Sequence, residues 1–133
     1  MTFEPGQQLE TASFSVRRSD LVRYAGASGD FNPIHWSDRV ATSVGLPGVI
    51  AHGMYTLALA SRAVVGWVGD PGRVVSFGAR FTKPVVVPDD DEGTVVVVEG
   101  VVTSVEDGLA MIDLTVSNDD QKVLGMPKAV VRC

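Results

Sequence analysis

An aspartate and a histidine, Asp30 and His35, stand five positions apart in a segment restricted by glycine and proline. Gly29 permits backbone conformations that other residues avoid, and Pro33 fixes its own φ and favours extended geometry at Asn32. A loop held in this way can direct both side chains into one cleft. Histidine exchanges protons near neutral pH, and a neighbouring carboxyl group can take the complementary role. The pair suggests acid–base chemistry, although loop aspartates more often cap turns and loop histidines are often simply half buried.

A second candidate lies at residues 51–54, Ala-His-Gly-Met, where a long apolar segment begins. The first N–H groups of a helix have no partner within the helix and carry partial positive charge, which suits a developing oxyanion. Gly53 would let a substrate carbonyl approach the backbone closely, whereas its simpler role would be to relieve crowding where the helix enters the core. His52 is either a second base or, more simply, a residue that orients the loop.

The hydrophobic pattern predicts helices in the first half of the chain, and these must position both segments. The segment that begins at Gly53 is apolar on nearly every face, with Arg62 its only charge, so we expect a buried helix. The expected elements are a strand over 8–16, a helix that starts at Asp20 with Ser19 as N-cap and is ended by Gly26, Gly29 and Pro33, a helix over 37–44 and the long helix over 53–68.

Sixteen of the 24 valines lie beyond residue 73, between clusters of turn residues. Such runs predict antiparallel strands, roughly over 73–83, 94–105, 109–117 and 122–132. Pro127, within the last of these, implies an edge position or a bulge. The long helix is the element able to cover one face of the sheet. We therefore predict an α+β class, a single domain over residues 1–133 with an antiparallel sheet wrapped around a long central helix.

A sheet of this kind has open edges. The valine run 95–98 would be prone to association if it lay at an exposed edge, and dimerisation into a continuous sheet is a common remedy. We expect a dimer, and the pattern leaves open whether the partner is identical.

Charge and composition exclude several classes of function. The net charge is −5, and residues 64–133 carry six basic and eleven acidic side chains, which argues against a nucleic acid or an anionic membrane as partner. The N-terminal residues lack the pattern of a signal peptide, so we expect a cytoplasmic protein. Cys133 is the only cysteine, so we expect neither a disulfide within the chain nor a cysteine metal site.

Taken together, these segments resemble a known family. The pattern Asp30-x-Asn32-Pro33-Ile34-His35 resembles the hydratase motif of the MaoC-like (R)-specific enoyl-thioester hydratases, and residues 51–54 resemble the next landmark of that family. Phe81 with Pro84, Val85 and Pro88 resembles a third landmark, so the similarity covers almost the whole chain. Within the family, the chain is most similar to catalytic subunits of mycobacterial-type (3R)-hydroxyacyl-[acyl carrier protein] dehydratases. Departures from the pattern are Ala27, Asp89-Asp90 and Pro127.

The resemblance implies the hot-dog fold and a reversible syn elimination of water from (3R)-hydroxyacyl thioesters, giving trans-2-enoyl thioesters. Asp30 and His35 would be catalytic: we assign removal of the C2 proton to His35 and proton delivery to the leaving hydroxyl to Asp30. These two roles could be exchanged or shared through one water molecule. The N–H of Gly53 would stabilise the thioester oxygen, and Asn32 would hold the loop.

The same resemblance suggests how the substrate is bound and carried. Trp67, Tyr55 and Leu59 could line an acyl tunnel, although core packing is the simpler role for each. His52 and Phe81 are further substrate-binding candidates. We expect no metal and no redox cofactor, because the substrate is a phosphopantetheine thioester of acyl carrier protein (acyl-ACP) or coenzyme A (acyl-CoA). The acyl chain length stays open.

A domain of this size leaves little room for a long acyl chain. The chain resembles catalytic subunits whose hot-dog partner provides the long acyl groove, and this resemblance implies a heterodimer with a second hot-dog subunit that lacks the Asp/His pair, with a homodimer as the alternative. Alternative functions are a stand-alone (R)-specific enoyl-CoA hydratase and a non-catalytic acyl-binding hot-dog subunit.

Overall fold

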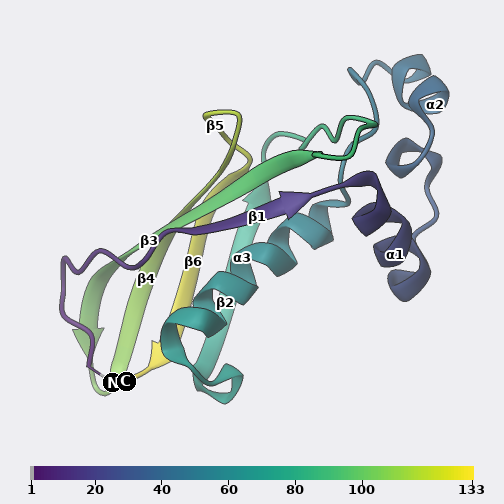
Figure 1. Ribbon diagram of the computed structural model, residues 1–133. Coiled ribbons are helices and arrows are strands. Elements are labelled where there is room, and N and C mark those ends of the chain that lie inside the picture. The colour runs from purple at the N-terminus through teal and green to yellow at the C-terminus, as the bar shows by residue number, and fades with distance from the viewer. Residues whose placement is uncertain (1) are drawn as a thin grey trace.

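The valine-rich half of the chain forms an antiparallel sheet that curves around one long helix (Figure 1). The structure is a computed structural model and describes residues 2–133. Within these residues the strand order is β1-β3-β4-β6-β2, and a short sixth strand, β5, pairs with β4. The strands are β1 (Ala12–Val16), β2 (Val74–Phe81), β3 (Thr94–Glu106), β4 (Leu109–Asn118), β5 (Gln121–Lys122) and β6 (Leu124–Arg132).

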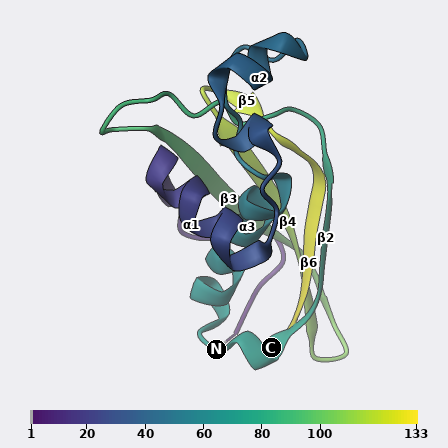
Figure 2. The ribbon, with the colours of Figure 1, turned by 90° about the vertical axis from the view of Figure 1, so that its right-hand side faces the viewer.

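The long helix, α3 (Gly53–Val68), lies along the concave face of the sheet, as predicted. Two shorter helices, α1 (Arg18–Ser28) and α2 (Asp38–Ser43), lie at one end of the molecule (Figure 1), the end that faces the viewer in Figure 2. Single 3-10 turns, η1 (Pro33–His35) and η2 (Pro71–Arg73), complete the helical elements of residues 2–133. No helix in this part of the chain is both long and apolar enough to cross a membrane.

The core lies between α3 and the inner face of the sheet. Along β4, Ala110, Ile112 and Val116 are fully buried, whereas Met111 between them is exposed, which is the period of two that an amphipathic strand shows. The helix is not buried on all sides: Met54, in its first turn, is 57% exposed. The prediction of a fully buried helix was wrong in this respect, because one curved sheet covers only one side of a cylinder.

Gly100 on β3 is required by the packing of Trp67 from α3. A Cβ at residue 100 would lie 2.6 Å from Cη2 of the indole ring, and the ring is held by a 2.7 Å hydrogen bond from its Nε1 to the carbonyl of Glu10. We expect Gly100→Ala to lower the free energy of unfolding by about 1–3 kcal/mol, since the ring cannot move without losing that bond. Denaturant unfolding measures this loss.

A matched control is Gly66→Ala within α3, where a Cβ would meet nothing within 4 Å. This change should raise the free energy of unfolding by roughly 0.5–1 kcal/mol, because alanine favours the helix. Equal effects of the two substitutions would contradict the account of Gly100.

The first helix differs from its prediction at its start and at Gly26, and it ends at Gly29, another of the residues predicted to end it. Ser19 lies inside α1 and is not its N-cap; the carboxylate of Asp20 accepts the N–H of Arg17 at 2.9 Å and satisfies the start of the helix. Gly26 continues the helix, which ends at Gly29 in the left-handed region at φ 77°. A glycine within a helix costs only about 1 kcal/mol, so it interrupts a helix less strictly than the sequence pattern suggests.

The valine run 95–98 does not lie at an edge of the sheet. It lies within β3, which pairs with β1 on one side and with β4 on the other. The open edges among residues 2–133 are those of β1 and β2. The predicted first strand is also shorter than expected, because regular pairing begins at Ala12 and Gln8 forms only an isolated bridge to Val101.

Pro127 lies in a β-bulge, one of the two positions predicted for it. On β6, Met126 and Pro127 together face the single residue between Gly78 and Arg80 of β2. Met126 takes a positive φ of 49° and is 66% exposed. Proline has no N–H to donate to a neighbouring strand, and a residue in a bulge does not need to make that hydrogen bond.

Candidate active site

The segment that precedes α3 ties several parts of the fold together at one end of the sheet. The N–H of Ile50 donates to the carbonyl of Ile34 at 3.1 Å, and the N–H of Ala51 donates to the carbonyl of Val85 at 2.8 Å. The turn that carries His35, the N-terminus of α3 and the segment after β2 therefore meet at one place.

An ion pair holds α2 against α1 beside this junction. Arg18 Nη2 lies 2.9 Å from Asp38 Oδ1, and the same oxygen accepts the N–H of Val49 at 3.0 Å. The bond from Val49, followed by the guanidinium of Arg18, lowers the pKa of the Asp38 carboxyl. Asp38 therefore links α2 both to α1 and to the segment that precedes α3.

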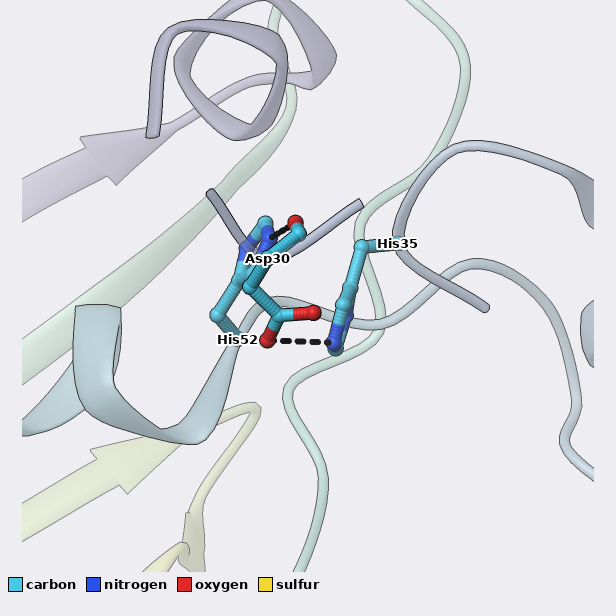
Figure 3. A group of neighbouring side chains, drawn as sticks. All are labelled: Asp30, His35 and His52. Atoms are coloured by element: carbon cyan, nitrogen blue, oxygen red, sulfur yellow. Dashed lines mark hydrogen bonds and ion pairs between the residues drawn. The ribbon is translucent and has the colours of Figure 1, made fainter. Parts of the chain in front are cut away.

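His35 is buried, and one of its ring nitrogens is committed to the backbone. Its Nδ1 lies 2.8 Å from the carbonyl oxygen of Ile50. A carbonyl oxygen can only accept, so Nδ1 carries a proton and the neutral ring presents an unprotonated Nε2. This nitrogen lies 3.8 Å from Oδ2 of Asp30 (Figure 3). The tautomer thus makes Nε2 the basic atom of the ring.

Asp30 is fixed by its own loop and remains accessible. One carboxylate oxygen, Oδ1, accepts the N–H of Asn32 at 3.2 Å, while the backbone N–H of Asp30 donates to Ser28 Oγ at 3.1 Å. The other oxygen, Oδ2, faces His35, and the side chain is 50% exposed. A separation of 3.8 Å is too long for a direct hydrogen bond, but one hydroxyl or water oxygen can bind both atoms.

Asn32 acts within the loop. Its Oδ1 accepts the N–H of Ile34 at 3.2 Å and so caps η1, the turn that presents His35. The predicted holding role of Asn32 is consistent with this contact, which is directed at the backbone and not at the cleft.

His52 packs directly against the pair. Its ring stacks on that of His35, with centroids 3.9 Å apart and an interplanar angle of 23°. Its Nε2 donates to the carbonyl of Asp30 at 3.1 Å, and the ring of Tyr24 packs edge-on at 4.8 Å. The side chain is 1% exposed, and Nδ1 has no hydrogen-bond partner within residues 2–133. His52 therefore holds the main chain of Asp30 and the ring plane of His35.

Burial lowers the pKa of His52, and the neighbouring His35 lowers it further, while the bond to the Asp30 carbonyl acts in the opposite direction. Because the unfolded ring takes up a proton more readily, the stability that a neutral His52 contributes is present above about pH 6.5. It is lost as the pH falls below that value towards the lower pKa of the folded protein.

We therefore expect the free energy of unfolding to fall more steeply between pH 7.5 and 5.5 in the wild type than in His52→Gln, which keeps a donor and does not titrate. Urea unfolding at the two pH values measures the difference. Equal slopes in both proteins would show that His52 is not the group responsible.

A cleft of about 260 Å³ opens beside the pair. His35 lines it, as do Gly53 at the first position of α3 and Phe81 at the end of β2. The N–H of Gly53 has no acceptor within the helix, since a carbonyl four residues earlier lies outside it. A Cβ at residue 53 would lie 3.1 Å from the ring of Phe81, so glycine also permits a close contact there.

The other predicted substrate-binding residues lie elsewhere. Leu59 is buried in the core, and His52 lies behind His35. Tyr55 packs edge-on against Tyr24 at 5.2 Å, and burial raises the pKa of its phenol. None of the three is among the residues that line the cleft.

Thr56 is a cleft residue that the sequence analysis missed. It is 4% exposed, lines the cleft and lies one helical turn after Gly53. The spacing of three along a helix places the two residues on one face, and this was the available signal. Lys83 lines the cleft as well, from the loop that follows β2.

Asp30, His35 and His52 also offer three ligand atoms within 4.8 Å of one another. A histidine nitrogen binds a metal ion that lies in the plane of the imidazole ring. The rings of His35 and His52 are stacked and nearly parallel, so they cannot both point at one ion. The arrangement fits a proton-transfer pair with a supporting ring better than a metal centre. His35 and the backbone N–H of Gly53 lie at the cleft, and Asp30 lies beside His35 without being among the residues that line the cleft.

The sequence matches the protein-family model described as MaoC like domain over residues 2–121. It is 42% identical over 77 residues to 3-hydroxyacyl-thioester dehydratase X of Mycobacterium tuberculosis, covering 58% of this chain and 26% of that protein. It is 46% identical over 86 residues to fatty acid synthase subunit beta of Aspergillus oryzae, covering 62% of this chain and 4% of that protein. The chain thus spans about a quarter or less of these relatives.

Solved structures confirm the predicted fold class. A MaoC-like dehydratase superposes with a TM-score of 0.94 and 35% identity, covering 98% of this chain and 40% of that chain. The ChsH1-ChsH2 complex from Mycobacterium tuberculosis contains a chain with a TM-score of 0.84 and 22% identity, covering 99% of this chain and all of that one. At that identity the second likeness concerns the fold alone.

Proposed function

The chain belongs to the MaoC-like domain family, and from this premise we propose that it catalyses the reversible dehydration of (3R)-hydroxyacyl thioesters to trans-2-enoyl thioesters. The carrier is acyl carrier protein or CoA, and the setting is fatty acid synthesis in the cytoplasm. The observation that carries the proposal is the pairing of Asp30 Oδ2 with His35 Nε2 at 3.8 Å, beside the cleft that His35 and Gly53 line.

In the dehydration direction, His35 removes the proton from C2. The bond from its Nδ1 to the carbonyl of Ile50 supports this role, because it leaves Nε2 free to accept a proton. That carbonyl also stabilises the imidazolium that forms. Asp30 delivers a proton to the 3-hydroxyl, which leaves as water. Both groups act from one side of the substrate, in keeping with syn elimination.

Charge develops on the thioester oxygen as C2 loses its proton. The N–H of Gly53 donates to this oxygen at the positive end of α3, and the absence of a side chain lets the carbonyl come close. The reaction needs no metal and no redox cofactor, since proton transfer and one hydrogen-bond donor account for every step. The substrate arrives as a phosphopantetheine thioester.

The first test is hydration of crotonyl-CoA by the purified chain, followed by loss of enoyl-thioester absorbance and by chiral analysis of the product. We expect (3R)-hydroxybutyryl-CoA. A (3S) product, thioester hydrolysis, or no reaction with crotonyl thioesters of either CoA or acyl carrier protein would refute the proposal.

We further propose a heterodimer with a second hot-dog subunit. The open edge of β2, eight residues long, offers backbone groups for a continuous sheet, and the cleft is small for a long acyl chain. The two named components of the ChsH1-ChsH2 complex are consistent with pairing between chains of this fold.

Size-exclusion chromatography and activity of the pure chain test this partnership. We expect a preference for short enoyl thioesters that broadens to longer ones on co-expression with a neighbouring hot-dog subunit. A stable homodimer that handles long and short substrates equally would instead favour a stand-alone hydratase.

A further inference from the structure

All three lysines of this acidic chain lie at one corner of the fold. Lys83 follows β2, and its backbone N–H donates to the carbonyl of Val123 at 3.4 Å. Val123 directly follows Lys122, so Lys83 and Lys122 lie on neighbouring segments. Lys128 lies on β6, just beyond the bulge at Pro127. The net charge of −5 makes this concentration of cations a local feature and not a property of the whole surface.

These lysines line two clefts that adjoin. Lys83 lines the cleft of His35 and Gly53. Lys122 and Lys128 line a second cleft of about 470 Å³, on the other side of the end of β2. Thr82 and Leu124 line both clefts, so they form a shared wall.

The bulge of β6 forms part of the second cleft, since Met126 and Pro127 both line it. Met126 adopts a positive φ of 49°, a conformation that costs a residue with a side chain free energy. Strained backbone of this kind concentrates at binding sites, where a fixed shape is required.

The charged residues that line the second cleft are two lysines and one carboxylate, so it carries an excess of one positive charge. Asp113, which faces Lys128 across the strand pair, is the one carboxylate among the residues that line it. Asp119 and Asp120 lie in the turn that precedes β5. The ion pairs within 4.0 Å among residues 2–133 involve Arg18, Arg23 and His35, so none of the lysines is paired in this way. The lysine side chains are therefore available to an anion.

We propose that Lys83, Lys122 and Lys128 bind a phosphate group of the substrate's pantetheine carrier, with the second cleft as the phosphate site. The inference rests on the proposed function, which places the thioester carbonyl at Gly53. 4′-Phosphopantetheine carries its phosphate at the end remote from the sulfur, so the phosphate must lie outside the catalytic cleft. Lysine binds phosphate as a flexible point charge and needs no fixed geometry.

The experiment compares crotonyl thioesters of pantetheine, 4′-phosphopantetheine, CoA and holo acyl carrier protein. The test variant is Lys122→Gln/Lys128→Gln. Its matched control is Arg23→Gln/Arg39→Gln, which removes the same charge from two exposed residues of α1 and α2. Thermal unfolding verifies that both variants are folded.

We expect the lysine variant to lower kcat/KM for crotonyl-CoA by about tenfold, through KM, and to leave crotonyl-pantetheine within about twofold. The control variant should change neither substrate beyond about twofold. If kcat/KM of the lysine variant falls with crotonyl-phosphopantetheine as well as with crotonyl-CoA, the lysines bind the phosphate next to pantetheine. If it falls with crotonyl-CoA alone, they bind the phosphates of the nucleotide.

Three results would overturn the inference: equal losses with pantetheine and CoA, a loss confined to the carrier protein, or equal losses in the control variant. Wild-type activity with crotonyl-pantetheine separates failure of the phosphate site from failure of the proposed dehydratase function. If that activity is present and the lysine variant behaves as wild type, the phosphate site alone is refuted. If the wild type acts on none of the four thioesters, the proposed function fails and the phosphate site fails with it.

Discussion

Asp30→Asn is expected to lower the turnover of crotonyl-CoA hydration by at least about a hundredfold, with the fold intact. An acid–base group typically contributes about 10²–10⁴ to the rate. Asparagine is nearly the same size and keeps an oxygen that can accept the N–H of Asn32, as Oδ1 of Asp30 does at 3.2 Å. The loop should therefore be retained, and the loss should come from the missing proton donor. Steady-state kinetics with a matched unfolding curve measure it.

His35→Ala should cause a loss of similar size. Because the two residues act on one substrate as a unit, the double variant should be little worse than either single variant. Asp107→Asn, in the turn between β3 and β4, is the matched control and should leave turnover unchanged. Near-wild-type kcat in either site variant would remove Asp30 or His35 from the mechanism.

Gly53→Pro is expected to lower turnover by about 10²–10³ through loss of one backbone donor to the thioester oxygen. Proline is favoured at the first position of a helix. The preceding residue, His52, already has φ −58° and ψ 133°, an extended conformation that a following proline accepts. The helix should therefore persist. Circular dichroism checks that the helix is kept, and kcat measures the loss of turnover.

The new side chain at residue 53 would also push against Phe81, whose ring lies 3.1 Å from the position of a Cβ. Gly53→Ala has the same Cβ but keeps the N–H, so it isolates this steric effect. Phe81 is 57% exposed and can move, so the alanine variant should lose far less activity than the proline variant. Equal losses in the two variants would show that the N–H is not the essential feature.

The sequence alone located the elements whose causes are local. The predicted bounds of α3 agree with the structure because its apolar period has no internal proline and Gly69 ends it at φ 79°. The strands after residue 73 agree closely because turn residues separate runs of valine. The approach of Asp30 to His35 also has local causes, since Asn32 caps the turn between them.

Features that depend on residues distant in the chain were decided by the tertiary structure. The order of the strands places the valines of β3 inside the sheet, and no local pattern encodes that order. His52 stacks on His35 from 17 positions away, and Thr56 and Phe81 meet at one cleft from a helix and a strand. Composition and periodicity specify which faces are apolar, but only the packing of α3 against the curved sheet determines which of those faces meet.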